Sequence, residues 1–269
     1  MTILQKIITH KRKEVAERKA LYPVQLLEKS IHFETPVVSL KKYLTRPDKS
    51  GIIAEFKRRS PSKGNINPYA SVEQVSIGYM MAGASALSVL TDEQFFGGRR
   101  EDLTTARKFN FCPILRKDFV IDEYQLIEAK SIGADAVLLI AECLDIKDLR
   151  QLAKTAKGLG LEVLMEVHSA TQLNKLTENV DIVGVNNRDL ATFNVSIQTS
   201  LDLFRAIPKE LVKISESGIS NVDSIITLKQ AGYQGFLIGE HFMKTAQPHK
   251  TCMQFIKDIQ RAEAKLTNV

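Results

Sequence analysis

The sequence lacks the features that mark several classes of protein. Only three of its 269 residues are cysteines, and they form neither a CxxC pair nor an even disulfide framework. Free thiols are therefore expected, in a protein of the reducing cytoplasm. No stretch approaches the roughly 18 apolar residues of a membrane span. The charged, amphipathic N-terminus lacks the pattern of a signal peptide, so no contact with a membrane is expected.

Metal-binding and nucleic-acid-binding patterns are missing as well. The five histidines do not occur at ligand spacing, so no metal site is expected. The net charge of +6 fits either a nucleic-acid surface or a small anionic substrate. Lysine and arginine are spread along the chain, apart from residues 11–13 and 57–59, and no DNA- or RNA-binding motif is present. We therefore favour a small anion and expect no nucleic acid.

What the sequence does contain is a repeated alternation of apolar strands and helical segments. Strands are predicted at residues 52–57, 86–90, 112–116, 136–140, 162–167, 182–186, 212–215 and 236–238. Helices are predicted near residues 71–82, 100–108, 122–131, 145–157, 169–177, 197–206, 221–230 and 249–264. Eight such units in a chain of this length indicate an α/β fold, the TIM (β/α)8 barrel. The alternative, an open doubly wound sheet, is less favoured because no GxGxxG motif follows the first strand.

The first 48 residues precede this alternation. They contain three segments with helical spacing, near residues 3–19, 24–29 and 39–43, and Thr2 with Gln5 matches a capping box. We therefore expect a single barrel domain over residues 1–269, in which residues 1–48 form an N-terminal helical extension packed on the barrel.

Polar residues accumulate where the predicted strands end. Glu55 and Lys57 share one face of the first strand, because side chains alternate along a strand. Charges on a buried face are costly unless they are paired or used, and alone this pair is better explained as a structural ion pair. Most of the other strand ends are also polar: Thr91 and Asp92, residues 116–118, Glu166 and His168, residues 186–189, residues 215–218, and Gly239 with Glu240. TIM barrels carry their chemistry at this end, so the interpretation shifts toward an active site.

Two glycine-containing turns predict an anion site. Ser217-Gly218 and Gly239-Glu240 each precede a helix, and backbone N–H groups in such turns favour an anion. Either turn alone would be weak evidence, since glycine is common there. Because they follow the seventh and eighth strands, Gly218, Gly239 and Glu240 together predict a phosphate site.

Motifs at five strand ends resemble the indole-3-glycerol-phosphate synthase family. They lie at residues 53–62, 115–119, 166–168, 186–190 and 215–219, in that family's order and spacing, and the resemblance covers essentially the whole chain. It implies a carbon–carbon lyase of L-tryptophan biosynthesis, a carboxy-lyase. Such an enzyme closes the ring of 1-(2-carboxyphenylamino)-1-deoxyribulose 5-phosphate, with loss of CO2 and water, to give indole-3-glycerol phosphate. It needs no cofactor and no metal. A monomer is expected, with other tryptophan-pathway enzymes as the candidate partners.

The resemblance also implies roles for individual residues. The expected catalytic residues are Glu55, Lys57, Lys117, Glu166, Asn186 and Ser217. A lysine would protonate the substrate ketone; Lys117 is favoured for this step, with Lys57 in the later dehydration or binding the substrate carboxylate, and the division between them stays open. Glu166 and Glu55 would stabilise the positive charge that develops on nitrogen, and one of them would act as base.

Further residues are expected to bind substrate. Asn186 and Ser217 would hold sugar hydroxyls and neighbouring carboxylates. Arg188 would fix a carboxylate or orient Glu55, and Ser60 would belong to a loop that closes over the site. The remaining expectations concern Phe96, Phe119 and Leu190, at positions that line the anthranilate pocket in the family, although plain packing explains each nearly as well.

Two histidines near these motifs receive no catalytic role. His168 is expected to be a hydrogen-bonded structural residue. His241 stands where many relatives carry a small residue, one position beyond the expected phosphate-binding amide.

Two other functions are compatible with parts of the pattern. A phosphosugar isomerase barrel would use a different acid–base pair, without the Glu-x-Lys of the first strand and the lysine of the third together. A non-catalytic basic barrel bound to nucleic acid would need a lysine-rich exposed face with stacking aromatic residues, and the sequence shows neither.

Overall fold

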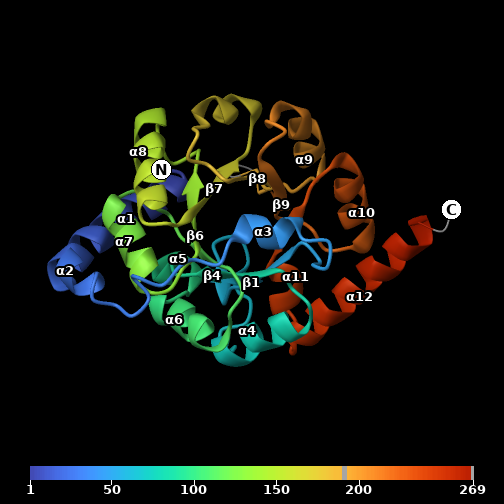
Figure 1. Ribbon diagram of the computed structural model, residues 1–269, viewed down its shortest axis with the longest axis horizontal. Helices are drawn as coiled ribbons and strands as arrows, with labels where there is room; N and C mark the ends of the chain where they lie inside the picture. Colours follow the sequence, from blue (N-terminus) through green and yellow to red (C-terminus); the bar gives the residue numbers. More distant parts are fainter. Residues whose placement is uncertain (190–192, 268–269) are drawn as a thin grey trace.

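The structure is a computed structural model that describes residues 1–189 and 193–267. Within these residues, eight parallel strands close into a barrel surrounded by helices (Figure 1). In chain order the strands are β1 (Ile52–Phe56), β4 (Ala86–Leu90), β5 (Ile114–Lys117), β6 (Ala136–Ile140), β7 (Glu162–Val167), β8 (Ile182–Asn186), β9 (Val212–Glu216) and β10 (Gly235–Ile238). Strand β1 pairs with both β4 and β10, which completes the ring. The TIM barrel expected from the sequence is confirmed.

Helices follow the strands and cover the outside of the barrel (Figure 1). They are α4 (Val72–Met81), α5 (Glu93–Phe96), α6 (Arg100–Phe109), α7 (Glu123–Ser131), α8 (Ile146–Gly158), α9 (Gln198–Leu203) with the 3-10 turn η2 (Phe204–Ala206), α10 (Val222–Ala231), α11 (Glu240–Met243) and α12 (Pro248–Thr267). The expected starts are present, since Ser71 accepts a hydrogen bond from the Gln74 N–H and Asp122 from the Tyr124 N–H. A short antiparallel pair, β2 (Arg59–Ser60) and β3 (Gly64–Asn65), lies in the loop after β1.

One predicted helix takes a different form. The segment near residues 169–177 is a 3-10 helix, η1 (Ala170–Lys175), rather than an α-helix. Its start has no side-chain cap, and the Gln172 N–H reaches only back to the Ser169 carbonyl, in the i→i+3 pattern. Helices of the 3-10 type occur mainly as short pieces. The helical pattern of this segment predicted a helix but not its type.

Alternation along the strands separates two apolar layers. Ile52, Ala54 and Phe56 of β1 pack outward against the helices, whereas Ile53 packs inside the barrel. Side chains of successive residues point to opposite faces, so Glu55 follows Ile53 toward the interior. The interior cluster combines residues from all eight barrel strands with two from the N-terminal segment, namely Leu40, Leu44, Ile53, Ala86, Leu115, Ala136, Leu138, Ile140, Leu164, Ile182, Val212, Ile214 and Leu237.

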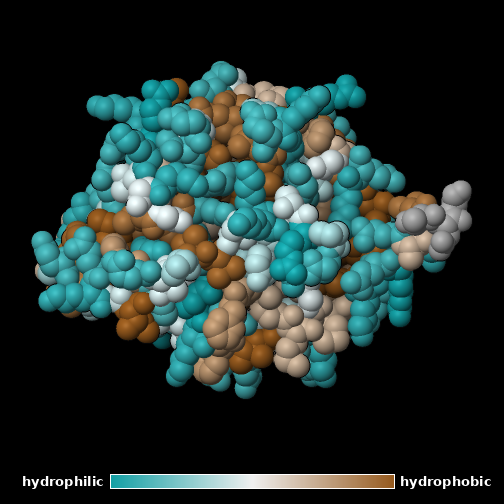
Figure 2. Space-filling model, viewed as in Figure 1, coloured by the Kyte–Doolittle hydropathy of each residue, from teal (hydrophilic) through white to brown (hydrophobic). Residues whose placement is uncertain are grey.

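Helix α3 (Leu40–Thr45) closes the end of the barrel at which the strands begin. Leu40 and Leu44, one turn apart on the same helix face, enter the interior cluster. Glu162, at the start of β7, accepts hydrogen bonds from the Ser39 hydroxyl and the Lys41 N–H and so holds the first turn in place. In Figure 1 this helix lies across the centre of the ring, and Figure 2 shows that the same face is largely hydrophilic, with apolar residues in separate patches. The apolar side of α3 is therefore turned inward.

We expect Leu40→Ala to lower the free energy of unfolding by about 2–5 kcal/mol, because a fully buried leucine leaves a cavity when it is truncated. Leu40 is 0% exposed, whereas Leu26 on α2 (Val24–Leu27), in the same N-terminal segment, is 52% exposed. Leu26→Ala is the matched control and should change stability by about 0.5 kcal/mol or less. Urea unfolding measures both, and equal losses would contradict a plugging role for α3.

Helix α1 (Ile3–Leu21) packs beside α7. The expected capping box is confirmed, because Thr2 and Gln5 exchange hydrogen bonds. The Tyr124 hydroxyl donates to the carbonyls of Arg18 and Tyr22 at the end of α1, and the Arg18 guanidinium pairs with Glu128 on α7. None of the helices in the described part of the chain is both long enough and apolar enough to cross a bilayer.

Candidate active site

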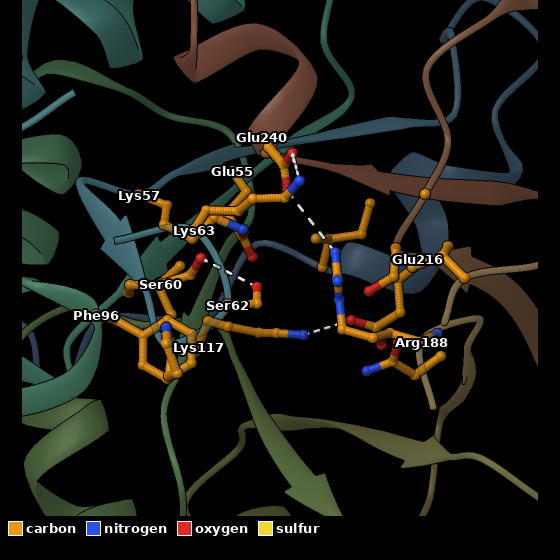
Figure 3. A pocket seen from close by; sticks show the side chains of 18 of the residues that line it. Glu55, Lys57, Ser60, Ser62, Lys63, Phe96, Lys117, Arg188, Glu216 and Glu240 are labelled. Atoms are coloured by element: carbon orange, nitrogen blue, oxygen red, sulfur yellow. Dashed lines mark hydrogen bonds and ion pairs between the residues drawn. The ribbon is translucent and has the colours of Figure 1, made fainter. Parts of the chain in front are cut away.

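A cavity of about 490 Å3 opens at the carboxyl ends of the strands. Figure 3 shows its polar side chains converging from several strands and loops. It is lined by every described residue expected in the site: Glu55, Lys57, Ser60, Phe96, Lys117, Phe119, Glu166, Asn186, Arg188, Ser217, Gly218, Gly239 and Glu240. Leu190 lies outside the described residues. The structure thus brings together groups that are up to 185 positions apart in the sequence, from Glu55 to Glu240.

Glu55 and Lys57 form an ion pair on the inner face of β1. The Lys57 Nζ lies 2.8 Å from the Glu55 Oε1, and the glutamate is buried. Gly239 is packed against the same carboxylate, because a Cβ at position 239 would stand 2.4 Å from the Glu55 Oε1. A glycine at the end of β10 is therefore required for Glu55 to take this position, in addition to any contact with an anion.

Lys117 lies between two carboxylates at the end of β5. Its Nζ is 3.2 Å from the Glu166 Oε2 and also contacts the Glu216 carboxylate. Burial alone would lower the pKa of Lys117, but Glu216, Glu166 and Glu55 outweigh it and raise that pKa well above its usual range. The ammonium group therefore holds its proton at neutral pH.

Glu166, at the end of β7, is held in its charged form. Its Oε1 accepts a hydrogen bond of 3.1 Å from the Asn186 amide. Burial would raise the pKa of Glu166, but the charge of Lys117, with smaller contributions from His168 and Asn186, lowers it below the usual value. The carboxylate is thus ready to face a developing positive charge.

Glu216 is a site residue that the sequence reasoning did not select. It is buried at the end of β9, and burial together with the nearby Glu166 raises the pKa of Glu216 to about 7. The cause is a local imbalance: among the described residues, the carboxylates of Glu55, Glu166 and Glu216 share two ammonium groups, those of Lys57 and Lys117, with His168 beside Glu166. Burial and the neighbouring negative charges thus favour a proton on Glu216 more than they would in water.

A signal for Glu216 does exist in the sequence. It follows Val212 and Ile214 at spacing two, and both of these pack inside the barrel. Glu55 follows Ile53 in the same way. The glycine-containing turn predicts Ser217 and Gly218, whereas Glu216 is predicted by the alternation of side chains along β9.

The turn after β9 has an unusual backbone. Ser217 has φ +70° and Gly218 has φ +73°, two successive residues in the left-handed region. For a serine this costs energy, which is typical of functional sites. The Asn187 amide donates to the Ser217 carbonyl (3.1 Å) and holds the turn, while Val195 lies so close to Gly218 that a side chain there would clash.

An apolar wall borders the charged groups. The rings of Phe96 and Phe119 lie 5.9 Å apart, as expected for residues that line one pocket. Ile3, Leu4 and Ile7 of α1 line the same cavity. The periodicity of α1 predicted an apolar face, but nothing in the local sequence shows that this face turns toward an active site more than 50 residues away in the chain.

Charged side chains also cross the mouth of the cavity. Lys63, in the loop after β1, and Arg188, after β8, each lie 3.7 Å from the carboxylate of Glu240 (Figure 3). The Glu240 side chain thus binds two cations, and only its backbone remains suited to the phosphate role expected for it.

The histidines differ in part from expectation. Neither ring nitrogen of His168 has a hydrogen-bond partner among the described residues. The prediction that His168 is a hydrogen-bonded structural residue is therefore wrong. Instead its Nε2 faces the Glu166 carboxylate at 3.5 Å, an ion pair when the ring is protonated. His241 packs against the rings of Phe242 and Phe255. Across residues 1–189 and 193–267, no group of three or more His, Cys, Asp or Glu side chains is arranged to hold a metal ion.

Comparison with known proteins places this site in a family. The family model described as indole-3-glycerol phosphate synthase matches residues 4–255. The chain is 50% identical over 258 residues to the indole-3-glycerol phosphate synthase of Bacteroides thetaiotaomicron, covering 96% of this chain and 99% of that one. It is 42% identical over 250 residues to the protein of the same name from Acidithiobacillus ferrooxidans, covering 91% and 95%.

Solved structures with low sequence identity share the fold. A mutant tryptophan synthase alpha-subunit from Pyrococcus furiosus superposes with a TM-score of 0.58 at 14% identity, covering 80% of this chain and 99% of that one. A 3-hexulose-6-phosphate synthase from Salmonella typhimurium gives 0.62 at 12% identity, covering 78% and 99%. At these identities the likeness concerns the barrel alone.

Proposed function

The chain belongs to the indole-3-glycerol phosphate synthase family, and we propose that it closes the indole ring of 1-(2-carboxyphenylamino)-1-deoxyribulose 5-phosphate, releasing CO2 and water. The enzyme is a decarboxylating lyase of tryptophan biosynthesis. The observation that carries the proposal is the placement of Lys117 between Glu166 and Glu216, beside an apolar wall. Such a wall excludes water and strengthens the charges beside it.

The first step forms a carbon–carbon bond. The ring carbon that bears the carboxylate attacks the ketone carbon, and the ketone oxygen takes a proton from Lys117. Positive charge develops on the ring nitrogen, opposite the ionised Glu166. Loss of CO2 then returns the electron pair of the broken bond to the ring.

The second stage removes water. The new hydroxyl leaves from the former ketone carbon with a proton from an acid, a role that we propose for Lys57. A base takes a proton from the adjacent CH2 group, and the double bond of the indole forms. We assign the base to Glu216, whose pKa of about 7 suits both accepting and releasing a proton near neutral pH.

The remaining expected residues are proposed to bind substrate. Asn186 and Ser217 would hold hydroxyl groups of the sugar chain, and Arg188 a carboxylate. The backbone of the Ser217–Gly218 turn and of Gly239–Glu240 would bind the phosphate. Ser60 would belong to the loop that covers the site, and Phe96 with Phe119 would bind the anthranilate ring, as would Leu190.

We also propose that the chain is a single domain over residues 1–269, monomeric and cytoplasmic, with residues 1–48 as an extension that belongs to the active unit. The contacts of Ile3, Leu4 and Ile7 with the cavity support that last point. The proposed reaction uses no cofactor, and neither nucleic acid nor a membrane takes part.

The function is tested with purified protein and the carboxyphenylamino-deoxyribulose phosphate. The expected result is a rise in indole fluorescence together with release of CO2. The same substrate without its carboxylate is the control and should release no CO2, because its attacking ring carbon carries hydrogen in place of the carboxylate. Folded protein that leaves the complete substrate unchanged would refute the proposal.

The pH dependence should report on Glu216. Because the base acts after CO2 has been lost and must be deprotonated to act, its ionisation enters kcat. We expect kcat to rise with pH and to level off above about 7, where Glu216 loses its proton. Glu216→Gln should lower kcat and remove this rise. The profile is measured from pH 5 to 9 at saturating substrate concentration. A rise near pH 7 that persists unchanged in Glu216→Gln would assign it to another group.

A further inference from the structure

Lys11, on α1, is a buried lysine outside the proposed reaction centre. Its side chain is 1% exposed. Its Nζ lies 2.9 Å from the Asp118 Oδ1, 3.0 Å from the Asp92 Oδ2 and 2.8 Å from the Glu14 Oε2. Both aspartate side chains are 0% exposed. A charge is buried this deeply only when it is closely paired, so these groups depend on one another for their positions.

Each of the two aspartates holds a piece of the cavity wall. Asp92 caps α5, accepting hydrogen bonds from the N–H groups of Phe95 (2.7 Å) and Phe96 (3.2 Å). Asp118 stands between Lys117 and Phe119 in the chain and accepts from the Phe119 N–H at 2.8 Å. Phe96 and Phe119 are the two rings that face each other in the cavity. Lys11 therefore joins the end of β4 to the end of β5 at the point where both rings and Lys117 are anchored.

The two aspartates differ in how far they depend on Lys11. Asp118 also accepts hydrogen bonds from the Thr91 hydroxyl (2.6 Å) and the Arg116 guanidinium (3.1 Å). The Asp92 Oδ2 has no hydrogen-bond donor among the described residues and faces the Lys11 ammonium group. Loss of the Lys11 charge would leave Asp92 as a buried, uncompensated anion, and α5 with Phe96 would have to shift to reach water.

We propose that Lys11 is a positioning residue for ring closure, which fixes Phe96, Phe119 and Lys117 relative to the substrate through Asp92 and Asp118. The proposal rests on the proposed function. The N-terminal helix then does two things at the site, since Ile3, Leu4 and Ile7 line the cavity and Lys11 binds the two aspartates next to Phe96 and Phe119. Chemistry of this kind is sensitive to position, because a displacement of about 1 Å can cost about a hundredfold in rate.

The test compares lysines on one helix. Lys11→Met keeps an unbranched side chain, one atom shorter, and removes the charge. Lys19→Met is the matched control, because Lys19 also pairs with an aspartate, Asp122, but is half exposed. We expect Lys11→Met to lower kcat by about tenfold to a hundredfold in protein that circular dichroism shows to be folded, with a smaller change in KM. Lys19→Met should keep the kcat of the wild type. If Lys11→Met shifts only the melting temperature and leaves kcat and KM unchanged, Lys11 is merely structural.

Two further variants decide the matter if Lys11→Met does not fold. In Lys11→Met/Asp92→Asn the unpaired buried anion is removed, and asparagine still caps a helix well, so folding should return while kcat stays at least about threefold below that of the wild type. Lys11→Arg keeps the positive charge but places it on the larger guanidinium group. We expect its kcat to lie between those of the wild type and of Lys11→Met/Asp92→Asn. Wild-type kcat in both variants would overturn the proposal.

A crystal structure of Lys11→Met/Asp92→Asn gives a readout that does not depend on the reaction. The centroid distance between Phe96 and Phe119 should depart from 5.9 Å, or the Lys117 Nζ should leave its place beside Glu166. Unchanged positions of all three groups would overturn the positioning role. If the wild type fails to form indole, the proposed function fails, while this structure still decides whether Lys11 holds the wall.

Discussion

Lys117→Ala is expected to lower kcat for ring closure by at least about a hundredfold, the scale of one lost acid–base group. The reason lies in the position of the ammonium group, which is partly buried, protonated and aimed into the cavity between Glu166 and Glu216. Without it, the alkoxide that forms from the ketone has no proton donor at this place. Single-turnover measurements isolate the chemical step from product release, and full activity of the variant would remove Lys117 from the mechanism.

Lys117→Arg separates the two roles that a lysine can have here. Arginine keeps the positive charge but does not release a proton in proteins. If Lys117 acts as general acid, Lys117→Arg should be nearly as slow as Lys117→Ala. If only its charge matters, Lys117→Arg should recover most of the rate. The same comparison at Lys57 would settle how the two lysines divide protonation of the ketone and removal of the hydroxyl.

Glu166→Gln should also reduce kcat by at least about a hundredfold. The substitution keeps the size of the side chain and an oxygen for the Asn186 amide, but it removes the negative charge that faces the developing cation. The effect should fall on kcat more than on KM, because the interaction is strongest in the transition state. Full activity of Glu166→Gln would contradict its role.

Glu142→Gln is the matched control for this variant. Glu142 follows β6 at the same end of the barrel and accepts a hydrogen bond from the Gln172 amide. It lines a neighbouring pocket, which shares Asn186 and Arg188 with the main cavity, and does not itself line the main cavity. Its kcat should stay within about threefold of the wild type. A comparable loss in both variants would mean that any change of charge at this end of the barrel disturbs catalysis.

The residues along β1 show how far the sequence leads. Alternation predicted that Glu55 and Lys57 share a face, and the end of a TIM-barrel strand predicted that this face reaches an active site. Both follow from local geometry, and the structure has the two side chains 2.8 Å apart in the cavity. The same alternation along β9 predicts that Glu216 also faces the interior at the end of its strand.

The contribution of α1 could not have been predicted in this way. Lys11 and Ile7 belong to an ordinary amphipathic pattern, whose partners are chosen by contacts with residues about a hundred positions away. The Asp118 carboxylate forms an ion pair with Lys11. In the sequence, Asp118 is simply one of several polar residues at the ends of strands. Such long-range pairs are fixed by how the helix docks, and a single sequence holds no local signal of docking.

The closure of one end of the barrel by α3 also governs molecular traffic. Leu40 and Leu44 fill that end together with the other apolar side chains of the interior, while the cavity opens at the opposite end. A bulky phosphorylated product must leave by the opening through which the next substrate arrives, past the side chains of Lys63 and Arg188 that meet at Glu240. We therefore expect product to leave this opening before the next substrate molecule can bind.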